Sequence, residues 1–275
     1  MKEMIDIKMG QSFPLFLETF VTKKAESHML YHGRLYPQED LRLPSGVYAY
    51  GCPYPQMIFD SSITGATICS GVWEGGNFLS RASGIVIDYY NARVLSNRVL
   101  SNPSGDFSVK EINFYVANEN LEKLIIDSAF ISNPNIDNFL TGANIPYAYT
   151  LPAAIITIDD SEQTDFALGG EKQDNFRAKA VILTEDTFTR DVFLNACKIS
   201  NQRGFQLLPY TEMPTNESGD LKTGGYRSSD YSSFDVSVEA VKTSKLKDYV
   251  TKNLPNSIFA GFASFDLRRI GLTES

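Results

Sequence analysis

Residues 84–95 read G-I-V-I-D-Y-Y-N-A-R-V-L, and this stretch predicts a β-hairpin. Three β-branched residues, Ile85, Val86 and Ile87, occupy its first half, the segment 90–92 supplies a reversal, and Val94 and Leu95 follow it. Asn in that reversal tolerates the positive φ that tight turns require. We expect Asp88 and Arg93 to lie outside the core or to pair across the turn. The residues expected on the inner face are Ile85, Ile87, Val94, Phe114 and Val116.

Similar short segments surround this hairpin, with Gly, Pro, Asn and Ser between them. The expected strands are residues 46–50, 56–59, 67–73, 84–89, 93–95 and 109–116. Gly75-Gly76 is a second expected reversal. Several short strands at this spacing favour a β-sandwich or a small barrel.

The second half of the chain alternates between strand and helix patterns. The expected strands are residues 153–158, 176–183, 205–208, 234–241 and 257–267, and the expected helices are residues 186–202 and 244–254. Asp186 is placed to cap the first of these helices. A polar loop is expected over residues 159–175, and a Gly, Ser and Tyr-rich interaction loop over residues 211–233. Strand, helix and strand occur twice, which predicts one sheet with two packed helices.

Near the N-terminus, residues 12–30 carry apolar side chains at helical spacing, with Ser12 as a possible cap. This helix packs either on its own domain or against a neighbouring subunit. The predicted fold class is therefore α+β and strand-rich. We expect an N-terminal arm and amphipathic helix over residues 1–45, a β-sandwich-like domain over residues 46–145, and an α+β domain over residues 146–275.

Composition excludes several classes of protein. The 275 residues are 43% hydrophobic and 21% charged, which suffices to bury a sizeable core. A formal net charge of -8 argues against a broad nucleic-acid-binding surface. We expect neither a secretory leader nor a membrane-spanning segment. The three cysteines, Cys52, Cys69 and Cys197, lack metal-ligand spacing, so buried free thiols are expected.

Catalytic and metal-binding motifs are weak. His28 and His32 have the i, i+4 spacing of a zinc pair on a helix, but the Glu of H-E-x-x-H is missing between them. The acidic run 159–165 lacks the Gly and the closing Glu of a calcium-binding EF-hand loop, so a solvated loop is expected. No nucleophile elbow, P-loop or dinucleotide fingerprint occurs. We therefore expect no enzyme activity, no catalytic, cofactor-binding or metal-binding residues, and no cofactor.

Two binding signals are also weak. Asn216-Glu217-Ser218 matches a glycosylation acceptor, which we interpret as a chance match in a chain without a secretory signal. Tyr48, Tyr50, Tyr54 and Trp73 are candidates for an aromatic platform that binds sugar. Aromatic residues at this density are more often part of a core or an interface.

Two groups of segments resemble structural proteins of tailed-bacteriophage virions. The first group is similar to proteins of the neck and tail region and comprises F-D-S-S at 59–62, S-G-V at 70–72 and S-G-I-V-I-D-Y-Y-N-A-R-V at 83–94. The second group is similar to tail terminator and tail completion proteins and comprises L-P-A-A-I-I at 151–156 and F-R-A-K-A-V-I-L at 176–183. In those proteins an α+β domain forms a ring that caps the tail tube below the head, and a long helix commonly lies early in the domain.

The resemblance implies a virion structural protein, either a tail terminator or a head-to-tail connector. It implies self-association into a ring around the DNA channel, a hexamer by family analogy, after assembly in the host cytoplasm. The implied partners are neck, tail-tube or sheath proteins, and genomic DNA passes without specific binding; no membrane is involved. Residues 1–11 and 211–233 are expected connectors to neighbours. Two alternatives stay open: a baseplate or tail-tip structural protein, and a carbohydrate-binding β-sandwich module.

Overall fold

Strands from distant parts of the sequence form two units in the computed structural model, which describes residues 4–116, 150–165, 171–222, 225–231, 234–245 and 258–272. The α+β unit combines Met1–Ala25, Ile112–Thr211 and Tyr231–Ser275. The β unit combines Glu26–Glu111 and Glu212–Asp230. The predicted α+β, strand-rich class is confirmed.

These units differ from the three domains expected from the sequence. The N-terminal helix, expected in a separate segment 1–45, belongs to the α+β unit. Residues Glu212–Asp230, expected in the C-terminal domain, belong to the β unit. The expected boundary at residue 145 lies outside the described residues. Local periodicity cannot reveal such exchanges, because it carries no information about which distant segments pair.

A six-stranded sheet forms the centre of the α+β unit, in the order β12-β13-β14-β11-β10-β9. The strands are β9 (Asn113–Val116), β10 (Ala153–Asp165), β11 (Glu171–Thr184), β12 (Gly204–Phe205), β13 (Val236–Lys245) and β14 (Phe259–Leu272). Neighbouring strands are antiparallel, except that β9 runs parallel to β10. The strand expected at 205–208 is therefore a short edge strand, whereas those expected at 153–158, 176–183 and 257–267 are longer than predicted.

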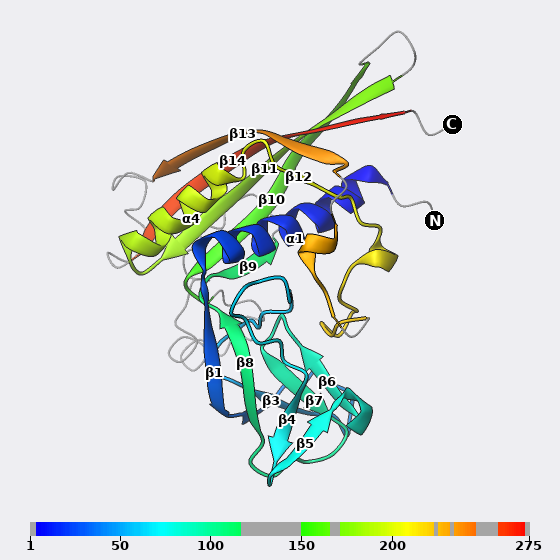
Figure 1. Cartoon of the computed structure of the whole chain (residues 1–275), viewed down its shortest axis with the longest axis vertical. Coiled ribbons are helices and arrows are strands. Elements are labelled where there is room, and N and C mark those ends of the chain that lie inside the picture. Colours follow the sequence, from blue (N-terminus) through cyan, green and yellow to red (C-terminus); the bar gives the residue numbers. More distant parts are fainter. Residues whose placement is uncertain are drawn as a thin grey trace. The chain divides into compact units, whose positions relative to one another are not determined.

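Two helices, α1 (Ile5–Ala25) and α4 (Thr187–Ile199), lie side by side on one face of this sheet (Figure 1). Phe13 of α1 is fully buried, and its ring meets that of Phe265 on β14 edge to face at 5.1 Å. Phe193 of α4 is also fully buried in the same core. The expectation that α4 is capped by Asp186 is confirmed, because the Asp186 carboxylate accepts a hydrogen bond from the Thr189 amide at 2.7 Å.

The helix predicted over residues 12–30 has different ends in the structure. It begins at Ile5 and ends at Ala25, with Pro14 inside it. Ser12 is not its cap but accepts a hydrogen bond from the Leu208 amide at 2.9 Å. Part of the expected N-terminal connector, residues 5–11, is thus helix, and Met9 is fully buried. Of the second expected helix, residues 244–245 are part of β13, and residues 246–254 lie outside the described residues.

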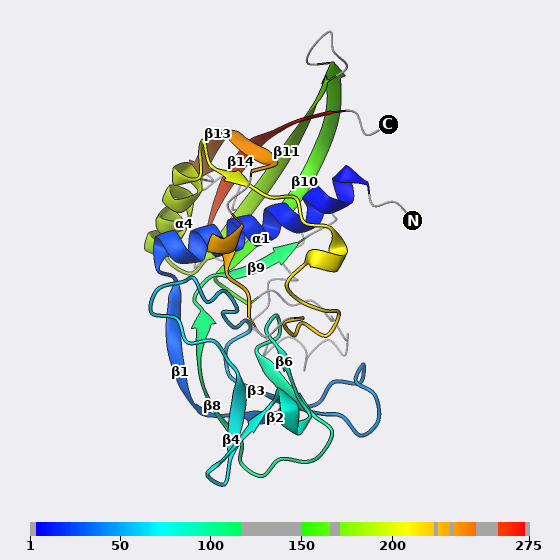
Figure 2. The same cartoon turned by 45° about the vertical axis from the view of Figure 1, so that its right-hand side comes forward.

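Long strands replace the polar loop expected over residues 159–175. β10 runs to Asp165 and β11 starts at Glu171, so the acidic run 159–165 is part of a strand. This distal hairpin pairs with β14 as far as Leu272 and reaches beyond both helices (Figure 2). The polar residues 159–165 fit a loop as well as an exposed strand. In the structure their backbone pairs with β11, so they form a strand.

Two four-stranded antiparallel sheets form the β unit, which confirms the expected β-rich part. One has the order β1-β8-β4-β5 and the other β2-β3-β7-β6. The strands are β1 (His28–Arg34), β2 (Tyr36–Gln38), β3 (Tyr48–Gly51), β4 (Gly71–Glu74), β5 (Asn77–Ser80), β6 (Ile85–Asp88), β7 (Arg93–Ser96) and β8 (Ser104–Lys110). The run expected as one strand over 109–116 is divided between β8 and β9, which belong to different units.

Both expected reversals are confirmed. β6 and β7 form the predicted hairpin, and Arg93 Nε donates to Asp88 Oδ2 at 2.8 Å across its turn. Gly75 and Gly76, both with positive φ, join β4 to β5. Of the five residues expected on the inner face, Ile85, Ile87 and Val94 are buried in the β unit, Phe114 is buried in the core of the α+β unit, and Val116 is exposed.

Residues Glu212–Asp230, which we call the strap, were expected to form an interaction loop. Instead they pack within the β unit (Figure 1). Arg81 donates to the Asp220 carboxylate, with Nη2 and Oδ1 2.7 Å apart. Asp60 accepts a hydrogen bond from the Ser228 amide at 3.1 Å, and the buried Tyr226 forms a β-bridge with it. Side-chain anchors far away in the sequence therefore fix the strap.

Candidate assembly interface

One margin of the six-stranded sheet is acidic. β9 pairs with β10 only at residues 153–156, and within the part of the chain that the structure describes no strand pairs with residues 158–165 on that side. We call residues 158–165 of β10 the acidic margin. Its sequence, I-D-D-S-E-Q-T-D, contains four acidic residues and no basic residue. An unpaired strand presents a row of backbone N–H and C=O groups that can pair with another strand.

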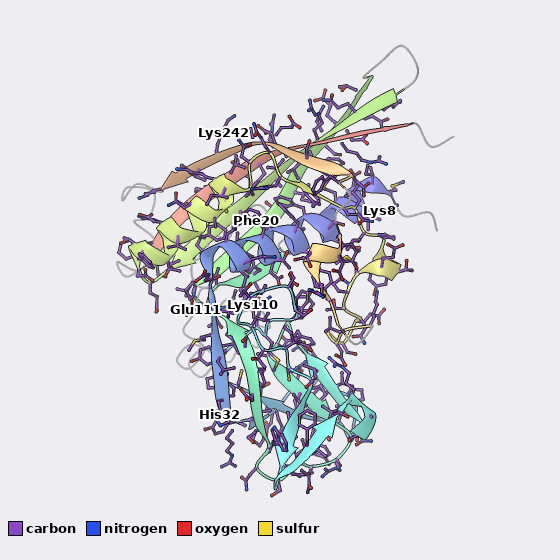
Figure 3. All side chains as sticks on the ribbon, viewed as in Figure 1. Lys8, Phe20, His32, Lys110, Glu111 and Lys242 are labelled. Carbon is purple, nitrogen blue, oxygen red and sulfur yellow. The ribbon has the colours of Figure 1, made fainter. Side chains whose placement is uncertain are left out.

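The opposite margin of the same sheet is basic. β12 pairs with β13 at residues 236–237, and among the described residues no strand pairs with residues 240–245 on that side. We call residues 240–245 the basic margin. Lys242 lies here on β13 with its side chain 81% exposed (Figure 3), and Lys245 contacts Asp191 at 2.7 Å on the surface. These lysines do not stand out in the sequence, because two lysines in a strand are ordinary unless the strand lies at the edge of a sheet.

The two margins are complementary in direction as well as in charge. β13, β14, β11 and β10 alternate in direction, so β10 and β13 are antiparallel to each other. When two copies meet head to tail, β10 of one therefore runs antiparallel to β13 of the next. The registers place residues 240–245 level with residues 154–160 of β10, so the two margins face each other when neighbouring copies are offset along the strands. Opposite charges across such a ladder stabilise it, and like charges destabilise it. The geometry thus favours β10-to-β13 pairing over β10-to-β10 or β13-to-β13 pairing.

The zinc-pair spacing of His28 and His32, a weak signal in the sequence, does not bring the two side chains together on a helix. His28 and His32 lie on the strand β1 and not on a helix, opposite Lys110 and Asp106 of β8. Four residues along a strand separate their backbones by about 13 Å, too far to share one metal ion. Lys110, which pairs with His28, lies at one end of the β1–β8 ladder, and Figure 3 shows His32 well separated from it along the ladder. Among the described residues, no group of three or more His, Cys, Asp or Glu side chains is placed to hold a metal ion.

The four candidate residues for an aromatic platform are also dispersed. Tyr50 is buried, and its hydroxyl accepts a hydrogen bond from the Leu100 amide at 2.7 Å. Tyr54 lies against Tyr31. Trp73, on β4, is 46% exposed but packs against Phe78 of the next strand. Tyr48 is on β3 in the other sheet of the β unit. The four residues therefore do not form a single sugar-binding face.

The glycosylation-like segment forms a turn in the strap. The Asn216 side-chain oxygen accepts hydrogen bonds from the amides of Ser218 and Asp220, at 2.9 and 3.1 Å. This local pairing gives Asn216 a structural role in shaping the turn.

The expectation of buried free thiols is confirmed for all three cysteines. Burial raises the pKa of Cys52 to about 11 and the pKa of Cys69 to about 12, and it also raises the pKa of Cys197. Groups with raised pKa values stay protonated at neutral pH, so none of these sulfurs is a ready nucleophile there.

We expect the native protein to react slowly with a disulfide reagent. A pKa raised by two or more units lowers the thiolate fraction at pH 7.5 at least about 100-fold relative to a free cysteine. Ellman's reagent should therefore label the native chain about 100 times more slowly than the urea-unfolded chain. Labelling of any cysteine at the unfolded rate would contradict the burial of that thiol.

No helix in the described ranges is both long and apolar enough to cross a membrane. Comparisons of the chain with protein-family models and with curated protein sequences find no match.

Proposed function

We propose that this chain is a structural protein that assembles into a ring. The observation that carries the proposal is the pair of margins on opposite sides of one sheet, acidic on β10 and basic on β13. A surface that pairs with a different surface on the next copy makes a head-to-tail contact, and such contacts close into rings when the rotation between copies allows it. Strand addition at a sheet edge supplies main-chain hydrogen bonds, and the charges select the register.

The ring that we propose belongs to the neck or tail of a tailed-phage virion, as a tail terminator or head-to-tail connector. The resemblance of residues 151–156 and 176–183 to tail terminator and tail completion proteins supports this assignment. The position of α1 adds support, because a long helix early in the chain packs on the same sheet as α4. The proposed partners are neighbouring neck, tail-tube or sheath proteins.

The negative net charge of the chain is compatible with a ring through which DNA passes. A subunit with a formal charge of -8 repels a polyanion, so DNA passes through the ring without being held. This proposal includes no catalytic role and no specific nucleic-acid contact.

Imaging of the full-length protein tests the proposal. Light scattering coupled to size exclusion should give a mass that is a multiple of 30.6 kDa, and negative-stain images should show closed rings. Antibodies against the chain should label the neck or tail of virions. A monomer at high protein concentration would overturn ring assembly, whereas rings that are absent from virions would overturn only the virion assignment.

A further inference from the structure

The short strands β9 and β12 restrict how two copies can join through the six-stranded sheet. β9 pairs with β10 at residues 153–156, and β12 pairs with β13 at residues 236–237. Those parts of the two margins are therefore occupied within each copy. The segments that can pair across a head-to-tail contact are the acidic margin, residues 158–165, and the basic margin, residues 240–245.

A contact without an offset along the strands is blocked. Within one copy, the registers of β14 and β11 place Lys242 level with Thr157 of β10. At zero offset, residues 243–245 of the next copy would lie opposite residues 154–156, where β9 already pairs. The next copy must therefore be shifted along β10 toward the end of the acidic margin.

Lys242 lies on the face of the sheet opposite to the helices. It pairs with Ser264 of β14, and both neighbours of Ser264, Ala263 and Phe265, are buried in the core that the helices cover. Successive side chains along a strand point to opposite faces, so Ser264 and Lys242 are on the other face. The exposed Lys242 side chain approaches Asp266 there at 4.0 Å.

Glu162 lies on the same face as Lys242. It is exposed and pairs with Asn175 of β11, whose neighbour Phe176 is buried in the core that the helices cover. Alternation along β11 therefore places Asn175 and Glu162 on the face away from the helices. Positions 160 and 164 of β10 share this face.

One register satisfies both the face and the space that is free. Residues directly opposite each other in an antiparallel ladder lie on the same face, so Lys242 can face only position 160, 162 or 164. With Lys242 opposite position 160, the end of the basic margin would reach the residues that pair with β9. With Lys242 opposite position 164, the start of the basic margin would pass the end of β10. Opposite Glu162, the whole basic margin pairs within the acidic margin.

We propose that neighbouring copies join in this single register, with Glu162 of one copy directly opposite Lys242 of the next. The inference rests on the proposed head-to-tail assembly and adds the pair of residues that sets its register. Side chains in directly opposite positions have Cβ atoms about 5 Å apart, and opposite charges there stabilise the ladder. The same pair disfavours the registers in which Lys242 meets no carboxylate.

The proposed register shifts each copy along its neighbour. Thr157 pairs with Lys179 and Glu162 with Asn175, so the shift from the level position equals four residues of β11, or about 13 Å. From β13 of one copy to β13 of the next there are four strand spacings, about 19 Å. When equivalent residues of all copies lie at one height in a ring, these two lengths tilt the strands by about 35° from the ring axis. Strands of closed barrels tilt by about 35–45°, so the register is compatible with closure.

Cysteine crosslinking of the full-length protein tests the register. The variant Glu162→Cys, Lys242→Cys carries its two new thiols on opposite margins of one sheet. Three strand spacings, about 14 Å, separate them within a copy, which is too far for a disulfide. Mild oxidation of the assembled variant should therefore link different copies into covalent oligomers, which non-reducing electrophoresis detects. Light scattering under reducing conditions measures assembly separately.

Two control variants move the cysteine on β10 and keep Lys242→Cys. Ser161→Cys places the thiol on the other face, and Thr164→Cys places it two residues farther along the same face. Both controls should crosslink at least 10-fold more slowly, because neither brings two Cβ atoms within disulfide distance. Rings in which a control crosslinks fastest would overturn the register alone. Absence of assembly by the unmodified chain would overturn the proposed ring as well.

Exchange of the two charges tests whether the pair sets the register. Glu162→Lys alone and Lys242→Glu alone should each weaken association about 10-fold, because each places like charges opposite each other. The variant with both substitutions should associate within about 3-fold of the unmodified chain. Lys242→Glu combined with Glu39→Lys, at an exposed position of the β unit, restores the net charge without the pair and should stay weakened. Failure of the exchange to restore association, or equal restoration by Glu39→Lys, would overturn the proposal.

Discussion

The double variant Lys242→Glu, Lys245→Glu is expected to be a monomer under conditions in which the unmodified chain forms rings. Each lysine lies in the basic margin, and the proposed neighbour presents the acidic margin to it. Reversing both charges converts attraction into repulsion, which costs about 1–4 kcal/mol per interface. At 1.4 kcal/mol per factor of ten, association weakens by about 5- to 700-fold. Size exclusion with light scattering measures the change.

The matched control for this variant is Lys23→Glu, Lys24→Glu. These two lysines are exposed in the last turn of α1 and belong to neither margin, and their reversal changes the net charge by the same amount. Each substitution removes a favourable interaction between a lysine and the C-terminal end of the helix dipole, which lowers the free energy of unfolding by about 0.5 kcal/mol. A loss of this size leaves the fold intact. Rings should persist in this control. Equal loss of rings in both variants would show that total charge, and not the basic margin, governs assembly.

Asp220→Ala is expected to release the strap from the β unit. The Asp220 side chain is only 9% exposed, and it accepts hydrogen bonds from both Nε and Nη2 of Arg81. Arg81 also donates to the Tyr89 hydroxyl at 3.0 Å, and that hydroxyl donates to the Cys69 carbonyl. Removing the carboxylate leaves a partly buried guanidinium without its main partner. Because the Arg81 side chain is 29% exposed, we discount the full cost of breaking a buried pair to about 2–3 kcal/mol.

Limited proteolysis and urea unfolding measure this effect. In Asp220→Ala, cleavage should concentrate within residues 212–230, and the free energy of unfolding should fall by about 2–3 kcal/mol. Asp230→Ala is the control, since Asp230 is exposed near the end of the same strap. It should unfold like the unmodified chain, within about 0.5 kcal/mol. Normal protease resistance of Asp220→Ala would show that other contacts hold the strap.

Sequence patterns correctly predicted those elements whose structure depends on residues close to one another in the sequence. The β6–β7 hairpin follows from alternation and a turn residue, and α4 follows from its apolar spacing and the Asp186 cap. Such features depend on interactions within a few residues. Errors occurred where long-range packing decided the outcome. Residues 28–30 belong to the helix expected over 12–30, but pairing with β8 makes them the start of the strand β1.

The candidate interface was only partly visible in the sequence. The acidic run 159–165 was recognised, but a polar segment without context fits a loop as well as an edge strand. Lys242 and Lys245 could be recognised as interface candidates only from the position of β13 at the margin of the sheet. The close approach of Gly219 to Asp88 could not be predicted from the sequence, because more than a hundred residues separate them.

The interleaving of the two units has a consequence for synthesis on the ribosome. α1 emerges first but has no sheet to cover until residues after Ile112 follow, and the β unit lacks Glu212–Asp230 until most of the chain is translated. Exposed apolar faces in such nascent intermediates invite aggregation. Neither half should therefore fold autonomously when expressed alone, and productive folding should be largely post-translational.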